Sequence, residues 1–86
     1  MEAAGFIRTP INDLLARADL IDEASDTLYY MGYLARGADD DTSQANCYII
    51  RYQKTGNIWK KLYASGNMIR DKVFDNRATY TYKPLQ

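Results

Sequence analysis

Positive charges alternate with aromatic rings over residues 47–63, the stretch of this sequence that most resembles binding chemistry. The side chains concerned are Tyr48, Arg51, Tyr52, Lys54, Trp59, Lys60, Lys61 and Tyr63. Proteins that bind single-stranded nucleic acid stack bases on aromatic rings beside a cationic groove. A solvated sheet uses the same residues, because Lys stems cover rings and Lys blocks pairing at an edge strand. A net charge of zero weakens attraction to phosphate, so nucleic acid is the second candidate partner here.

The acidic run Asp39-Asp40-Asp41 followed by Thr42 and Ser43 raises the question of a calcium site. Carboxylates and hydroxyls are hard oxygen ligands of the kind that Ca²⁺ prefers. An EF-hand loop, however, needs Gly at its sixth position and Glu at its twelfth, where this chain has Gln44 and Ile50. We therefore predict a solvated loop and no metal.

Other reactive residues are few. Cys47 is the one cysteine and the chain has no histidine to activate it, so we predict a buried, inert thiol without a disulfide. Asp71 and Asp75 stand among Arg70, Lys72 and Arg77, which favours local ion pairs over a pair for acid–base catalysis. We predict no catalytic residues and no cofactor, and therefore not an enzyme.

Tyrosine and the charge distribution both point toward protein contacts. Eight of the eleven aromatic residues are Tyr, a residue enriched at protein–protein interfaces and also suited to half-buried sheets. Residues 1–43 carry nine acids and three bases, a net charge of −6, whereas residues 44–86 carry eight bases and two acids, a net charge of +6. Either the halves neutralise each other within one molecule, or the acidic face of one copy meets the basic face of the next and builds a homo-oligomer.

The chain has 86 residues, with 47% apolar and 26% charged residues, which predicts one folded domain over 1–86. No apolar run is long enough to span a bilayer, and we expect neither a membrane partner nor a secretory signal. Residues 1–8, with Phe6 and Ile7, are expected to form a flexible arm. Thr9-Pro10 and the spacing of the apolar residues after it predict a helix over 9–22.

A β domain is expected over residues 27–82. Alternating residues predict strands over 27–35, 47–54 and 58–64, with a polar loop at 36–46 and a tight Gly56-Asn57 hairpin turn. Residues 68–74 fit a helical turn or an irregular crossing, 75–77 a turn, and 78–82 a last short strand. The predicted fold class is mainly β with an N-terminal helix: a small antiparallel sheet or sandwich of about four short strands.

Four segments resemble small proteins encoded in the structural gene cassettes of tailed bacteriophages. They are Tyr30-Met31-Gly32-Tyr33-Leu34-Ala35, Tyr48-Ile49-Ile50-Arg51-Tyr52, Tyr63-Ala64-Ser65-Gly66-Asn67 and Phe74-Asp75-Asn76-Arg77-Ala78-Thr79-Tyr80-Thr81-Tyr82. Ser65 stands where the family pattern tends to have Asp, and the N-terminal residues lie outside the resemblance. The resemblance implies a non-enzymatic structural protein of the virion, made in the cytoplasm of the host bacterium.

From the resemblance and the residues together, we expect a tail or fibre-attachment protein that contacts itself or other virion proteins. Capsid decoration is the alternative location, and a nucleic-acid-binding or host-regulating phage protein acting through hairpin 47–63 is the alternative function. The expected interface residues are Phe6, Ile7, Tyr29, Tyr33, Asp39, Asp40, Asp41, Tyr52, Trp59, Lys60, Lys61 and Tyr63.

Overall fold

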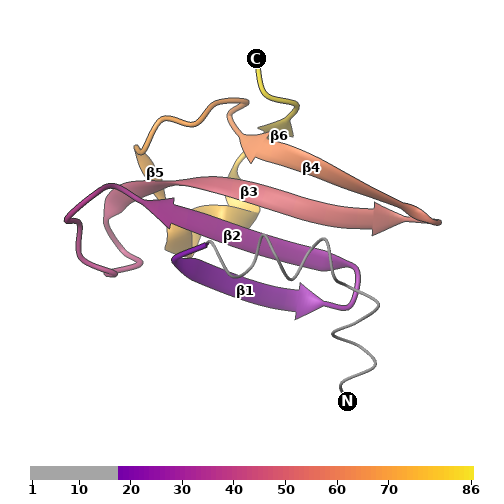
Figure 1. The fold of residues 1–86 in the computed structure, drawn as a ribbon, viewed down its shortest axis with the longest axis horizontal. Helices are drawn as coiled ribbons and strands as arrows, with labels where there is room; N and C mark the ends of the chain where they lie inside the picture. The colour runs from indigo at the N-terminus through magenta and orange to yellow at the C-terminus, as the bar shows by residue number, and fades with distance from the viewer. Residues whose placement is uncertain (1–17) are drawn as a thin grey trace.

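A computed structural model describes residues 18–86 as one small, open antiparallel sheet (Figure 1). Its strands are β1 (Leu20–Ser25), β2 (Leu28–Leu34), β3 (Ala45–Thr55), β4 (Ile58–Ala64), β5 (Lys72–Val73) and β6 (Tyr82–Lys83), with the 3₁₀ helix η1 (Phe74–Thr79) between the last two. The strand order is β1-β2-β3-β4-β6, and β5 pairs with β3 beyond the end of β4. The mainly β, antiparallel prediction is confirmed, with six strands in place of about four and an open sheet rather than a sandwich.

The centre of the sheet is formed by β2 and β3, whose side chains alternate between two faces, both of which hold buried residues. Tyr29 pairs with Tyr52 and Met31 with Ile50 on one face, while Gly32 pairs with Ile49 on the other. We call the first side the tyrosine face; its buried cluster is Tyr29, Met31, Ile50, Tyr52 and Tyr63. The opposite face carries Tyr30, Cys47, Ile49 and Ala64, and Phe74 of η1 packs on it. Strands with buried residues on both faces have nearly continuous apolar sequences, and β2 has such a sequence.

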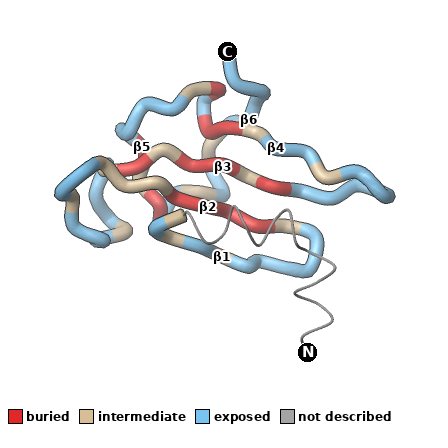
Figure 2. Tube along the Cα trace, in the orientation of Figure 1, coloured by how far each residue is buried: buried red, intermediate tan, exposed pale blue. Residues whose placement is uncertain are grey.

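The hairpin between β3 and β4 has the predicted two-residue connection. Thr55 pairs with Ile58 across Gly56 and Asn57, and Gly56 has φ +62, a conformation that glycine adopts without strain. Figure 2 shows buried positions along β2, β3 and the end of β4, whereas the tip of this hairpin and most of β1 are exposed. The hairpin therefore projects beyond the core.

The N-terminal prediction is corrected at its end. Residues 20–22, expected to finish a helix, belong to β1, whose Leu20, Ile21 and Asp22 pair with Gly32, Met31 and Tyr30. Pairing with β2 provides these residues with backbone partners, which outweighs the weak helical spacing. The rest of the predicted helix and the arm 1–8, with Phe6 and Ile7, lie outside the described residues.

The C-terminal prediction is corrected as well. Residues 68–71 are irregular, Lys72–Val73 form β5 and Phe74–Thr79 form η1. Of the strand predicted over 78–82, only Tyr82 lies in a strand, β6. Side-chain hydrogen bonds favour the helical turns: the Tyr80 hydroxyl accepts from the Val73 N–H at 2.8 Å, and the Tyr82 hydroxyl donates to the Arg77 carbonyl at 2.7 Å. Within residues 18–86, no helix is long and apolar enough to cross a membrane.

Candidate interface surfaces

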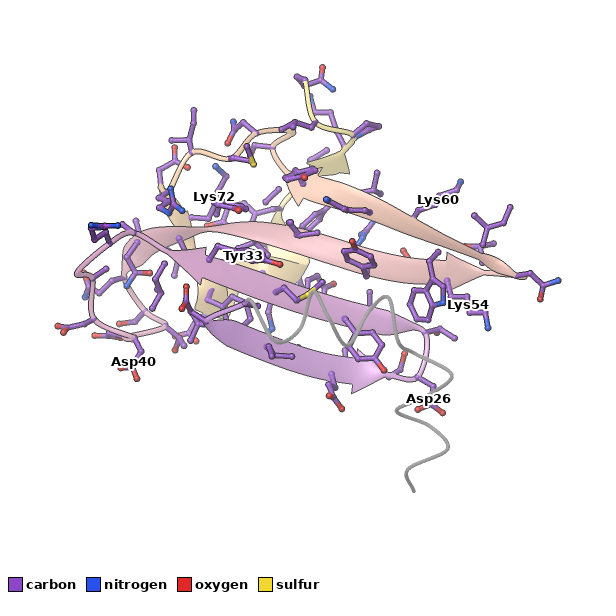
Figure 3. The ribbon with its side chains drawn as sticks, viewed as in Figure 1. Asp26, Tyr33, Asp40, Lys54, Lys60 and Lys72 are labelled. Carbon is purple, nitrogen blue, oxygen red and sulfur yellow. The ribbon has the colours of Figure 1, made fainter. Side chains whose placement is uncertain are left out.

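Acidic and basic side chains are separated across the sheet. Residues 18–34 contain four acids and no base, and residues 45–64 contain four bases and no acid. Because β2 itself is uncharged, the strand order places the acids at the β1 edge and the bases on β3 and β4. Asp26 and Lys60 accordingly lie on opposite sides of the β2–β3 centre (Figure 3). One sheet thus has an acidic edge and a basic edge.

We define the acidic edge as Asp22 and Glu23 on β1 together with Asp26 in the following turn. Asp22 accepts from Nε of Arg77 at 2.7 Å, and each of these side chains is 30% exposed. Glu23 and Asp26 are exposed, and neither has an ion-pair partner among residues 18–86. Both carboxylates therefore lie on the surface of the described sheet.

We define the basic hairpin as Arg51 and Lys54 on β3 with Lys60 and Lys61 on β4. Lys60 is exposed at the outer strand. Lys61 lies 5.5 Å from the centre of the Tyr63 ring, and hydrogen bonding to Tyr63 raises the pKa of Lys61, which keeps this side chain cationic. Arg51 is on the other face, with its guanidinium 4.7 Å from the centre of the Tyr82 ring.

The aromatic rings of this hairpin are already in contact with neighbouring side chains. Nζ of Lys54 lies 5.9 Å from the centre of the Trp59 ring, and Trp59 packs against Tyr29 with ring centres 5.8 Å apart. Trp59 is half-buried, and Tyr63 is 8% exposed. Stacking of bases needs aromatic rings with exposed faces, and the faces of these rings are partly covered by neighbouring side chains.

The tyrosines expected at an interface contribute mainly to the core. Tyr29, Tyr52 and Tyr63 are buried, at 1%, 8% and 8% exposure, and burial is the main cause that raises the pKa of Tyr52. Tyr33 is half-buried and stacks on Tyr48 with ring centres 4.8 Å apart. Their apolar area therefore stabilises this domain, and only Tyr33 among these four keeps appreciable surface.

The acidic loop, residues 39–41, is exposed and held by its own hydrogen bonds. Oδ1 of Asp41 accepts from the Ser43 hydroxyl at 2.7 Å and from the Ser43 N–H at 2.9 Å, and these bonds lower the pKa of Asp41. The Asn46 amide donates to the carbonyls of Asp39 and Asp41. In the described part of the chain, no group of three or more potential ligand side chains could hold a metal ion.

Cys47 is a fully buried thiol, as predicted, and burial raises its pKa. Sequence reasoning missed the neighbouring Lys72, which is 4% exposed. Its Nζ donates to Oδ1 of Asn67 at 3.1 Å, to the Ile69 carbonyl at 3.4 Å and to the Asp71 carboxylate. The local ion pair expected for Asp71 is thus present, whereas Arg77 pairs with Asp22 and not with its neighbour Asp75.

Large apolar side chains on the surface were also missed. Ile58 at the hairpin tip is 62% exposed, and four others are each about half exposed: Ile21, Met68, Ile69 and Leu85 (44%, 48%, 57% and 47%). Single exposed apolar residues are common on soluble proteins and need no partner. Two of these five lie on strands at the edges of the sheet: Ile58 on β4, beside Lys60, and Ile21 on β1.

Comparisons of this chain with family models, with curated proteins and with solved structures found no match.

Proposed function

We propose that this protein is a non-enzymatic structural subunit of a tailed-phage virion that acts through protein–protein contacts. One observation carries the protein–protein part of the proposal: a single small sheet has exposed acids at one edge and exposed lysines at the other. Complementary charges of this kind orient partners and set the register of an interface. The virion setting rests on the resemblance of residues 29–82 to phage structural-cassette proteins.

Within the virion, we propose a place at the tail or at a fibre attachment, with capsid decoration as the alternative location. A repeating particle needs subunits whose surfaces are complementary to other subunits, and separated charge provides this complementarity without an enzyme site. Other virion proteins and further copies of this chain are the proposed partners. The protein would be made in the cytoplasm of the bacterial host and then built into the particle.

The alternative function, nucleic-acid binding through residues 47–63, receives less support from the geometry. Four bases without an acid would attract phosphate, but Lys54 and Lys61 lie beside the rings of Trp59 and Tyr63 that would have to stack on bases. The two functions predict opposite results in a gel shift with single-stranded and double-stranded DNA. We expect no shift at physiological salt. A shift that weakens steeply with salt and disappears in Lys60→Glu/Lys61→Glu would favour the alternative.

The direct test of the virion role is the protein content of purified particles. Particles from the phage that carries this gene would be banded by density and analysed by quantitative mass spectrometry. We expect the chain at a fixed ratio to the major structural proteins, unchanged after a high-salt wash or nuclease treatment. If particles whose major proteins are readily detected lack this chain, the proposed function is wrong.

A further inference from the structure

Among the described residues, no other strand lies beside β1 at one outer edge of the sheet or beside most of β4 at the other. Within residues 18–86, β1 pairs with β2 alone, and β6 covers β4 only at Tyr63 and Ala64. The segment Ile58–Leu62 of β4 therefore forms an open edge. Open strand edges are templates for pairing with another chain.

The hairpin fixes which backbone groups of β4 face outward. The pair that closes a two-residue hairpin, here Thr55 and Ile58, exchanges its hydrogen bonds across β3 and β4, and hydrogen-bonded pairs then alternate along the strands. The N–H and C=O groups of Trp59 and Lys61 consequently point away from β3. Two neighbouring bonds agree with this alternation, because Lys54 N–H donates to the Thr27 carbonyl on the β2 side and Ser65 N–H donates to Thr81 on the β6 side.

Strand direction allows one copy to continue the sheet of the next. Each of the pairs β1–β2, β2–β3 and β3–β4 is antiparallel, so β1 and β4 run in opposite directions. A second copy placed beside β4 in the same orientation brings its β1 antiparallel to β4. Its tyrosine face then lies on the same side as that of the first copy.

Charge selects this arrangement over the two symmetric ones. Pairing β4 with β4 would bring Lys60 and Lys61 against the same lysines of the second copy, and pairing β1 with β1 would bring Glu23 and Asp22 against their own equivalents. Like charges across a strand pair destabilise it, whereas opposite charges favour it. Only the head-to-tail pairing of β4 with β1 places lysines beside carboxylates.

We propose that copies of this chain assemble head to tail by strand addition, with the open edge of β4 in one copy pairing antiparallel with β1 of the next. The inference rests on the proposed function and identifies one partner for it, a second copy of this chain. Glu23 meets Lys61 on the tyrosine face, and Asp22 is near Lys60 on the other face. Heterologous contacts of this kind build a closed ring when the rotation from one copy to the next allows closure, and otherwise an open filament.

Two charge-reversed variants and their mixture test the pairing. Lys60→Glu/Lys61→Glu makes both edges acidic, and Glu23→Lys/Asp26→Lys makes both edges basic, while the ion pair of Asp22 with Arg77 is left intact. Each variant alone is expected to lose self-association by about tenfold or more, because every contact becomes repulsive. Mixed in equal amounts, the two should assemble to the wild-type mass, because each acidic edge again finds a basic one.

A matched control changes the same charge elsewhere. Asp39→Lys/Asp40→Lys alters two exposed carboxylates at the loop, far along the sheet from Asp26 (Figure 3), and should leave the assembly unchanged. Circular dichroism and the thermal midpoint confirm that every variant folds. Hydrogen exchange gives the backbone readout: the Trp59 and Lys61 amides should be protected in the assembled wild type and exchange faster in dissociated Glu23→Lys/Asp26→Lys, which keeps both residues.

The outcomes separate the inference from the proposed function. An oligomer that both reversals leave intact, or variants that fail to recover when mixed, would overturn edge pairing while assembly of the protein stands. Monomeric wild-type protein at about 0.5 mM and low salt would overturn self-pairing by this edge. The dissociation constant would then exceed about 0.5 mM, and the binding free energy would be too small to build a particle from these contacts alone. Absence from purified particles would overturn the proposed function without bearing on the edges.

Discussion

Gly32 lies where β2 comes closest to η1. A Cβ built on Gly32 would be 2.9 Å from Cδ1 of Phe74 and 3.2 Å from Cβ of Leu20, closer than carbon atoms pack without displacement. The tight contact explains how Phe74 can be 5% exposed in so small a domain. The glycine therefore has a packing role, distinct from the conformational role of Gly56 in the hairpin.

Gly32→Ala is expected to destabilise the fold by about 1–3 kcal/mol through overpacking against Phe74. Urea unfolding followed by circular dichroism measures the change. The matched control is the same substitution made in a Phe74→Leu background, where the smaller side chain leaves room. An equal cost in both backgrounds would show that the contact with Phe74 is not the cause.

Three weakly acidic side chains with a raised pKa predict how stability responds to alkali. Burial holds Cys47, Tyr52 and Tyr82 in their neutral forms and raises the pKa of each. An acid whose pKa is higher in the folded state contributes stability that is present below the unfolded pKa and is lost as pH rises through the folded one. The ordinary values are 9.0 for the thiol and 10.0 for the phenols, so the free energy of unfolding should begin to fall near pH 9.

Cys47→Val separates the thiol from the phenols. The variant keeps a small apolar side chain in the core, and its stability should stay level until near pH 10, where unfolded tyrosines lose their protons. Chemical unfolding at closely spaced pH values between 7 and 11 gives both curves. An onset that stays at pH 9 in the variant would mean that another group controls the alkaline loss.

At the scale of elements, two side-chain contacts hold the C-terminal segment on the sheet. The ion pair between Asp22 and Arg77 joins β1 to η1, and Lys72 binds the turn at residues 67–71. Removal of one partner of a half-buried pair leaves the other with a desolvation cost, so each contact has an effect on stability larger than that of an exposed pair.

Lys72→Met should cost about 1–2 kcal/mol, because a similar volume is kept while the hydrogen bonds to Asn67 and the Ile69 carbonyl are lost. Amides of residues 67–71 should then exchange faster, whereas those of β2 and β3 should change only with global stability. Asp71→Asn is the control, since Asp71 is exposed and its loss leaves the other two bonds of Lys72 in place. Unchanged exchange in the turn would contradict this role of Lys72.

The central hairpin was readable from sequence, because alternation and a Gly-Asn turn are local signals. The predicted strands 47–54 and 58–64 match β3 and β4. The errors lie where distant partners decide the structure: Leu20–Asp22 became a strand through pairing with β2, and residues 78–79 became helical beside hydrogen bonds of Tyr80 and Arg77.

Among the predicted interface residues, too, some positions follow from local sequence and others depend on the fold. Exposure of Lys60, Lys61 and Asp39–Asp41 follows from their charge, and these residues are exposed in the structure. Tyrosine is ambiguous because its ring suits a core as well as an interface, and Tyr29, Tyr52 and Tyr63 are buried. The opposite charges of the two sheet edges could not be read from the sequence alone, since they depend on β1 being a strand and on the strand order.

At the scale of the whole molecule, a chain of this size has little core to spare, and further burial against neighbours would add to its stability. Assembly should therefore raise the thermal midpoint with protein concentration, because a folded oligomer is favoured by mass action. Scanning calorimetry over a hundredfold concentration range measures this shift. Lys60→Glu/Lys61→Glu, which we expect to be monomeric, should show a midpoint independent of concentration; equal concentration dependence in both proteins would argue against assembly by the β4 edge.

The most direct test of the central claim is the solution mass of the wild-type protein by light scattering at about 0.01 M and about 1 M salt. Screening shortens the reach of exposed charges from about 30 Å to about 3 Å between these conditions. We predict a mass of several 9.9 kDa chains at low salt that decreases at high salt. A mass of 9.9 kDa at both salt concentrations would contradict the account.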